Sequence, residues 1–113
     1  MKPRMYLSGP ITGLDRTVVQ GRFADAGHLL WQHGIEYVNP LTLCSGESGW
    51  HQCMRADIKA LCDCTHIVML HGWQESKGCH VELHLAHRLG IEIVVDLRDW
   101  LIEYERHNGG RAT

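Results

Sequence analysis

A glutamate within an apolar helical stripe is the first feature of this sequence that could carry chemistry. Residues 75–90 read as a loop that runs into a helix, which Gly90 ends as a C-terminal glycine. At about 100° per residue, Glu82 falls in the middle of the apolar side of this helix. That side is formed by Val81, Leu85, Ala86 and Leu89. Burying a lone carboxylate is costly, so this glutamate is either a rim residue that reaches solvent or a group of raised pKa kept for catalysis.

A second carboxylate, Asp57, lies at the edge of another apolar helical face. The predicted helix covers residues 50–62, and its apolar face is formed by Met54, Ile58, Leu61 and Cys62. Two carboxylates at one pocket can divide a glycosidic reaction: one attacks or stabilises the anomeric carbon, and the other manages the proton of the leaving group. We therefore expect Asp57 and Glu82 to form the reacting pair.

The histidines and cysteines could instead indicate a zinc site. The helical wheel places His80, His84 and His87 opposite the apolar stripe, which favours a solvated histidine face. The run His-Val-Glu-Leu-His resembles the zinc motif HExxH only loosely, because its glutamate is misplaced. We expect no metal and no cofactor. The odd number of cysteines in a cytosolic setting predicts reduced thiols rather than a disulfide framework. They are Cys44, Cys53, Cys62, Cys64 and Cys79.

Apolar runs and helical periods alternate along the whole chain. Strands are predicted at residues 5–8, 35–38, 66–70 and 91–95, and helices at 18–33, 50–62, within 75–90, and at 99–106. This order predicts an α/β fold: a parallel sheet of four to five strands with helices on both faces. The length predicts a single domain over residues 1–113.

Three loops are expected to meet beyond the carboxyl ends of the strands, where ligands bind in such sheets. They cover residues 8–13, 39–49 and 71–78. The first reads Ser-Gly-Pro-Ile-Thr-Gly and could present backbone N–H groups and a helix N-terminus to a phosphate. It is not a GxGxxG motif and lacks the lysine of a P-loop, so an ordinary tight turn is the alternative.

The composition excludes several classes of partner. The chain is 44% hydrophobic with a formal charge of −2, and no basic patch predicts binding to a nucleic-acid polymer. No apolar run approaches the roughly 18 residues of a membrane span. The first residues show no signal-peptide pattern, so we expect a cytoplasmic protein.

Three motifs taken together resemble the nucleoside 2-deoxyribosyltransferase superfamily. They are Tyr-Leu-Ser-Gly-Pro-Ile-Thr-Gly at residues 6–13, Asp57-Ile58-x-x-Leu61, and Ser76-x-Gly78-x-x-x-Glu82-Leu83-x-x-Ala86. The resemblance covers roughly residues 4–95 and is greatest to a small phage and bacterial branch, which carries the Gly-Trp-x-x-Ser-x-Gly seen at residues 72–78. It implies a flavodoxin-like or Rossmann-like three-layer sandwich. It also implies cleavage of the N-glycosidic bonds of (deoxy)nucleosides or their 5′-monophosphates.

The resemblance also implies roles for three residues. Glu82 matches the family nucleophile, which attacks C1′ of the sugar and forms a covalent glycosyl-enzyme, as in retaining two-carboxylate chemistry. Asp57 matches the aspartate that hydrogen-bonds or protonates the departing base. Tyr6 matches the tyrosine that orients the nucleophile.

The residue at position 76 helps to distinguish a nucleoside substrate from a nucleoside 5′-monophosphate. The transferase branch has an aspartate here, which contacts the sugar 5′-hydroxyl, whereas the branch that hydrolyses deoxynucleoside 5′-monophosphates has a serine. A carboxylate would repel a phosphate and a hydroxyl can donate to it, so the resemblance favours a 5′-monophosphate. The predicted substrate-binding residues are Ser8, Gly9, Pro10, Ile11, Gly13, Asn39, Ser76 and Gly78.

The sequence departs from this family in its first loop. Thr12 stands where the hydrolase branch has an arginine, and we expect Arg16 or Lys77 to substitute. Family members often complete the pocket across a subunit interface, which implies a homodimer or larger homo-oligomer here. Trp50 and Trp73 are candidates for that interface or for stacking on the base, with ordinary packing as the alternative.

The expected function is therefore an N-glycosidase acting on a nucleoside 5′-monophosphate. Two alternatives stay open for the same residues. One is base exchange between nucleosides, and the other is non-catalytic nucleotide binding.

Overall fold

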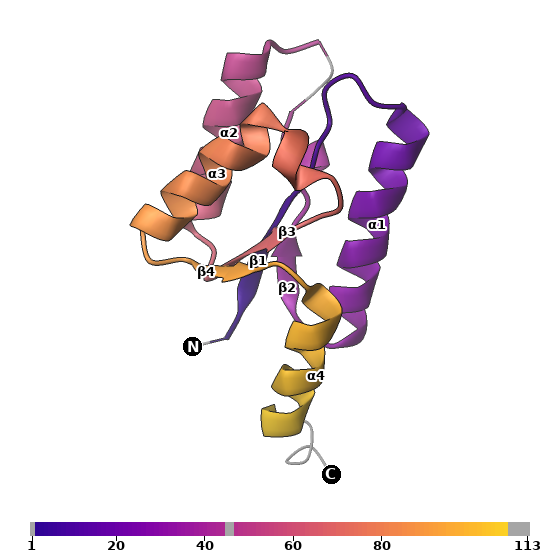
Figure 1. Ribbon diagram of the computed structural model, residues 1–113, viewed down its shortest axis with the longest axis vertical. Helices are drawn as coiled ribbons and strands as arrows, with labels where there is room; N and C mark the ends of the chain where they lie inside the picture. Colours follow the sequence, from indigo (N-terminus) through magenta and orange to yellow (C-terminus); the bar gives the residue numbers. More distant parts are fainter. Residues whose placement is uncertain (1, 45–46, 109–113) are drawn as a thin grey trace.

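Strands and helices alternate along the chain in the computed structural model, which describes residues 2–44 and 47–108 (Figure 1). In chain order the elements are β1 (Arg4–Ser8), α1 (Arg16–Gln32), β2 (Glu36–Val38), η1 (Pro40–Thr42), α2 (Trp50–Cys62), β3 (His66–Met69), η2 (Trp73–Glu75), α3 (Lys77–Arg88), β4 (Glu92–Val94) and α4 (Leu97–Asn108). Every predicted strand and helix is present, with small shifts at its ends. The two short 3-10 helices, η1 and η2, lie in segments that were expected to be loops.

The four described strands form one parallel sheet in the order β2-β1-β3-β4. This is the flavodoxin-like order, and it confirms the predicted α/β class. In the register of β1 and β3, Ser8 lies opposite Met69, so both strands end at the same edge of the sheet. Loops that follow the two central strands are therefore neighbours.

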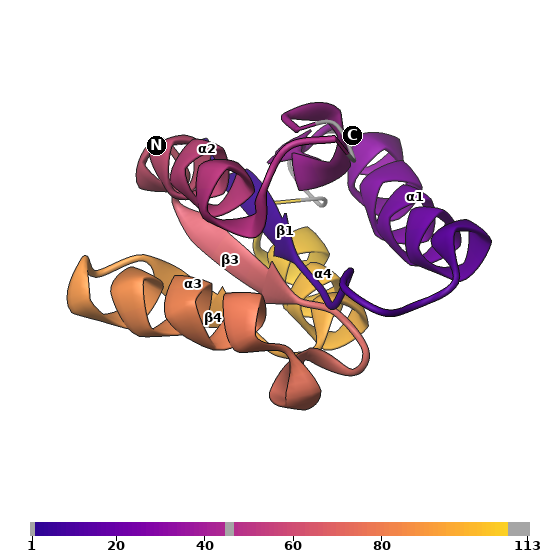
Figure 2. The same cartoon turned by 90° about the horizontal axis from the view of Figure 1, so that it is seen from above.

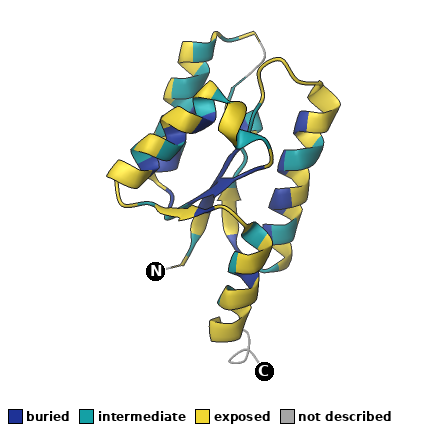
Figure 3. Cartoon of the chain, viewed as in Figure 1, coloured by how far each residue is buried: buried dark blue, intermediate teal, exposed yellow. Residues whose placement is uncertain are grey.

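Helices cover both faces of the sheet: α2 and α3 on one, α1 and α4 on the other (Figure 2). The core on the side of α1 and α4 includes Met5, Leu7, Phe23, Leu30, Val68 and Leu101. The core on the side of α2 and α3 includes Tyr6, Leu61, Ile67, Met69 and Ala86. Figure 3 shows the buried residues concentrated along β1, β3 and the inner sides of the helices. The two apolar clusters stabilise the sandwich by removing both sheet faces from water.

The alternation along β1 decides which side chains reach the site. Successive residues of a strand point to opposite faces, and Met5 and Leu7 belong to the core beneath α1 and α4. Tyr6 belongs to the other core, and Ser8, two residues on, shares its face. A serine buried on the face of a central strand requires a hydrogen-bond partner.

Polar side chains start the helices. The Asp15 carboxylate accepts hydrogen bonds from the backbone N–H groups of Thr17 and Val18 at the start of α1. Asp96 accepts from the N–H of Asp99, so α4 begins earlier than predicted. No helix within the described residues is long and apolar enough to cross a membrane.

The predicted buried face of α3 is wrong in part. Val81 is exposed and Leu89 is 57% exposed, whereas the buried residues of this helix are Cys79, Glu82 and Ala86. The small side chains of Cys79 and Ala86 allow the helix to lie close to the sheet, and this contact rotates the larger apolar residues outward. Glu82 is buried as predicted, and the three histidines of α3 are exposed.

The expectation that all cysteines are reduced is also wrong. Cys44 and Cys53 form a disulfide, which joins the segment after η1 to the first turn of α2. The Cα atoms of the two cysteines lie 5.5 Å apart, a distance that a disulfide spans readily. The remaining cysteines are free thiols: Cys62 is exposed, and Cys64 and Cys79 are buried.

Candidate active site

Glu82 is the centre of a buried polar cluster at the carboxyl end of β1. Its side chain projects from the inner side of α3 and is 5% exposed. The Tyr6 hydroxyl donates a hydrogen bond of 2.6 Å to Glu82 Oε2, and the Ser8 hydroxyl donates one of 2.7 Å to Oε1. Each carboxylate oxygen therefore has a donor fixed on a central strand, which holds the carboxylate in one orientation.

The bond from Ser8 was not predicted from the sequence, which assigned this residue to a phosphate cradle. The structure uses the Ser8 hydroxyl to hold Glu82, and a contact between Ser8 and a phosphate stays a prediction. One signal was available: Tyr6 and Ser8 are two residues apart on a strand, so the residue that orients Glu82 and this serine had to share a face.

Asp57 is the second acid of the cluster. It lies on the buried side of α2 and is 7% exposed. Its Oδ1 atom is buried and has no hydrogen-bond partner among the described residues. Unsatisfied buried oxygens are rare, and each one calls for an explanation such as an absent ligand. Asp57 is thus prepared to bind a donor, or to give up a proton, in a site that it shares with Glu82.

The protonation of the cluster follows from burial and from these contacts. Burial, reinforced by the charge of Glu82, raises the pKa of Asp57 to about 7. Burial also raises the pKa of Glu82, but the hydrogen bonds from Tyr6 and Ser8 oppose this rise. Burial and the neighbouring carboxylates raise the pKa of Tyr6, which stays a hydroxyl donor. Because only Glu82 has donors on both oxygens, the contacts favour the ionised form of Glu82 and the protonated form of Asp57.

The first turns of α2 and α3 pack against each other beside the two acids. A Cβ on Gly78 would lie 3.3 Å from Met54 Sδ and 3.9 Å from Trp50 Nε1, so a glycine at this position allows the close approach. The Lys77 ammonium lies 4.8 Å from the centre of a Trp50 ring, a cation–π contact. Gly78 therefore serves helix packing, whatever it contributes to substrate binding.

The residues of the loop after β1 have local structural roles, and the role of this loop as a phosphate cradle stays a prediction. The N-terminus of α1 already holds the Asp15 carboxylate, which would repel a phosphate there. Gly9 is required by packing, because a Cβ on it would lie 3.1 Å from Leu70 Cβ and 3.2 Å from Phe23 Cζ. Gly13 has a φ of 78°, which favours glycine, and Ile11 is exposed.

Two other predicted binding residues support backbone turns. Asn39 caps η1, since its side-chain oxygen accepts from the N–H of Leu41. Ser76 caps α3, since its hydroxyl oxygen accepts from the N–H of Cys79 at 3.2 Å. The Ser76 cap places that hydroxyl at the positive end of α3, one and a half turns before Glu82. The contacts of both residues with a substrate stay predictions.

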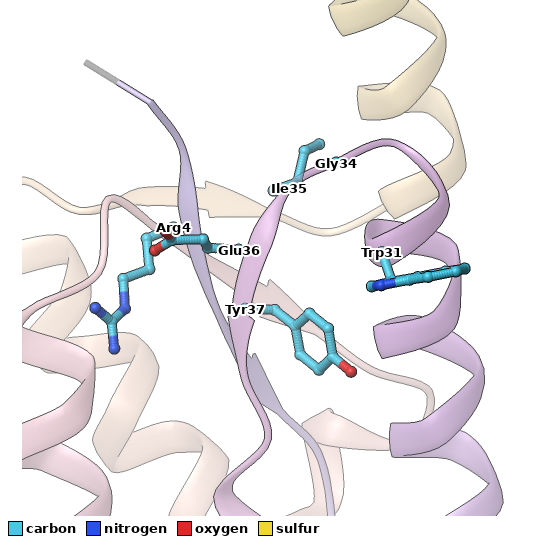
Figure 4. A pocket seen from close by; sticks show the side chains of 6 residues that line it. All are labelled: Arg4, Trp31, Gly34, Ile35, Glu36 and Tyr37. Atoms are coloured by element: carbon cyan, nitrogen blue, oxygen red, sulfur yellow. The ribbon is translucent and has the colours of Figure 1, made fainter.

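A surface hollow lies at the opposite end of the sheet (Figure 4). It is lined by Arg4, Trp31, Gly34, Ile35, Glu36 and Tyr37, at the start of β1 and β2 and the end of α1. Tyr37 points toward α1 in this view, while Trp31 lies against solvent. The hollow contains no pair of buried acids, so its shape does not make it the reacting site.

Metal ligation is the alternative role for the histidines, cysteines and acids of the chain. Within residues 2–44 and 47–108, no group of three or more His, Cys, Asp or Glu side chains is arranged to hold a metal ion. Burial raises the pKa of the Cys79 thiol, which adjoins Glu82, so this cysteine is a neutral neighbour and not a thiolate nucleophile.

Comparison with known proteins identifies one family. No curated protein matches the chain. The model of one family, described as a domain of unknown function (DUF4406), matches residues 3–95. This range runs from β1 through β4 and includes Tyr6, Ser8, Asp57 and Glu82. Because it covers most of the chain, the protein belongs to the DUF4406 family.

Proposed function

We propose that this protein is an N-glycosidase that cleaves the bond between base and sugar in a nucleoside 5′-monophosphate. The observation that carries the proposal is a pair of buried acids, Glu82 and Asp57, which differ in their hydrogen-bond partners. Glu82 is held by two hydroxyl donors, and Asp57 carries a buried oxygen without a partner. This asymmetry suits a reaction that needs one ionised and one protonated carboxyl.

The chemistry divides into two steps. In the first, a Glu82 oxygen attacks C1′, the bond from C1′ to the base nitrogen breaks, and its electron pair leaves with the base. Asp57 gives its proton to that base. In the second step, a water attacks C1′, Asp57 takes the proton of the water, and the bond to Glu82 breaks. The products are a free base and a sugar 5-phosphate.

Tyr6 and Ser8 act as positioning residues in this scheme. Their hydroxyls fix the direction of the Glu82 carboxylate and limit the rise of its pKa. A carboxylate that is held in the orientation of attack avoids part of the entropic cost of reaching the transition state.

Base exchange is the second candidate, and the burial of the two acids favours it. Glu82 and Asp57 are withdrawn from bulk water, so a base that stays bound competes with water for the covalent intermediate. The same residues serve both outcomes, because only the acceptor of the second step differs.

Release of free base from a panel of nucleosides and nucleoside 5′-monophosphates tests the proposal. We expect release from at least one 5′-monophosphate, and a glycosyl adduct on the intact protein by mass spectrometry. Glu82→Ala should lose both signals, and Glu92→Ala, a change of an exposed glutamate, should keep both. Formation of a new nucleotide from an added free base would indicate transfer. Binding of a nucleotide with no release from any substrate would contradict the proposal and favour a binding module.

A further inference from the structure

Arg22 is a half-buried cation without a counterion. It lies on α1, and every other lysine or arginine in the described part of the chain is exposed. It makes no hydrogen bond or ion pair with any residue that the structure describes. A guanidinium that is partly removed from water and left unpaired is unfavourable, so its surroundings fit an anion that binds there.

The position of Arg22 links it to the carboxyl edge of the sheet. One guanidinium nitrogen lies 3.8 Å from the point where a Cβ on Gly72 would stand, and Pro10 Cγ lies 3.3 Å from the same point. Gly72 has a φ of 85°, which favours a residue without a side chain. Arg22 therefore lies where the loop after β1 meets the loop after β3.

This meeting point adjoins the reacting acids along the backbone. Pro10 follows by two residues the serine that donates to Glu82, and the N–H of Leu70 donates to the carbonyl of Ser8 at 2.8 Å. Gly72 follows Leu70 by two residues. The guanidinium thus lies at the carboxyl edge of the sheet, beside the two loops that leave the central strands and close along the backbone to the serine that donates to Glu82.

The other cations that could serve this edge are placed differently. Arg16 is exposed at the first turn of α1, beside the Asp15 carboxylate that caps the helix. Lys77 lies over the ring of Trp50. Arg22 lies two turns into α1, away from that cap.

We propose that Arg22 binds the 5′-phosphate of the substrate, between the loops of Pro10 and Gly72. The inference rests on the proposed function, which it deepens by assigning the anion-binding residue and hence a phosphomonoester substrate. A guanidinium presents parallel N–H donors that match two phosphate oxygens. The cation thus comes from the body of α1 and not from the loop that precedes it.

Calorimetric titration of four proteins with the common deoxynucleoside 5′-monophosphates and their nucleosides tests this assignment. The proteins are the native chain, Arg22→Gln, Arg22→Lys and Arg16→Gln, which tests the exposed arginine that the sequence offered for the same role. We expect the native chain to prefer the nucleotide, and Arg22→Gln to weaken nucleotide binding by about 10- to 100-fold. Nucleoside binding should be unchanged in Arg22→Gln. Arg22→Lys should fall between native and Arg22→Gln, and Arg16→Gln should behave as native.

The outcomes separate this proposal from the glycosidase. If Arg22→Gln keeps the native preference for nucleotide over nucleoside, the assignment is wrong even though base release continues. If the preference depends on Arg22 but no substrate releases base, the anion site stands and the glycosidase fails. If Arg22→Gln does not fold, the titrations of the native chain still test the proposal. Equal affinity of the native chain for nucleotide and nucleoside would overturn it, and so would the absence of binding to either.

Discussion

Two glutamates at opposite edges of the sheet have similar partners and different surroundings. Tyr6 donates to Glu82 at the carboxyl edge, and the Trp100 indole N–H donates to Glu92 at the amino edge, at 3.1 Å. Glu92 opens β4 opposite His66, the first residue of β3, and its carboxylate lies 3.4 Å from the imidazole. Its side chain is 61% exposed, whereas Glu82 is buried.

The difference between the two glutamates lies in their burial and in the groups that face them. Glu92 faces water and the His66 imidazole. Glu82 is buried near a second buried acid, Asp57, whose pKa is raised by burial and by the charge of Glu82. A hydrogen bond from an aromatic residue is common to both sites and identifies neither. Burial beside an unpartnered acid is the feature that points to catalysis.

Replacing each glutamate by glutamine gives the largest expected contrast. Glu82→Gln keeps the shape of the side chain but removes the nucleophile, so the rate of base release should fall by at least about 1,000-fold. Glu92→Gln should stay within about twofold of native, because it lies at the opposite edge of the sheet. Equal losses in the two variants, measured on the same substrate, would remove the distinction between the two sites.

The pH dependence of base release should reveal the proton on Asp57. Protonated Asp57 is required as the acid, and its pKa is about 7, so kcat should fall about tenfold per pH unit above that value. At low pH the rate should fall again, as Glu82 takes up a proton. Asp57→Asn should be slower by about 100-fold or more and should lack the alkaline decline. An unchanged alkaline limb in Asp57→Asn would assign the titration to another group.

The same substitution should stabilise the folded protein at high pH. The pKa of Asp57 is 3.8 when exposed and about 7 here, so between these values the native state holds a proton that the unfolded state has lost. Stability therefore falls as the pH rises through this interval. In urea unfolding at pH 8, Asp57→Asn should gain about 1–3 kcal/mol, since it removes a buried unpaired charge. The exposed control Asp25→Asn should change little, and a loss of stability in Asp57→Asn would contradict the assigned protonation.

The smallest effect on stability is expected for the exposed contact between Trp100 and Glu92. Trp100→Phe removes the N–H that reaches Glu92 but keeps a ring that can stack on Tyr104. Its free energy of unfolding should fall by less than about 1 kcal/mol, because the lost bond is open to solvent. A loss above about 2 kcal/mol in urea unfolding would mean that this edge is more than a surface contact.

Much of this architecture could be predicted because the signals are local. The alternation of apolar runs with helical periods fixed the order of elements, and a glutamate among apolar residues identified Glu82 as buried. The rotation of α3 could not be predicted, because it depends on how closely Cys79 and Ala86 approach a sheet formed by distant segments. The disulfide of Cys44 and Cys53 depends on the path of a loop without periodicity.

Two polar residues, Ser8 and Arg22, occupy positions that were not predicted, for different reasons. Ser8 stands in a Ser-Gly-Pro turn, which suggested phosphate, and only its register on β1 relative to Tyr6 indicates Glu82. Arg22 is one polar residue among many on α1, a helix whose apolar and polar residues are not strongly segregated. Its position became visible only when the folded chain brought the loops of Pro10 and Gly72 together beside it.

The shortness of the outer strands limits how this protein could assemble. β2 and β4 form the borders of the described sheet and have three residues each. Borders of this length offer few backbone groups to a strand from another molecule, so continuation of the sheet into a neighbour would be weak. Any stable association between copies must therefore rely on side chains of the helices and loops.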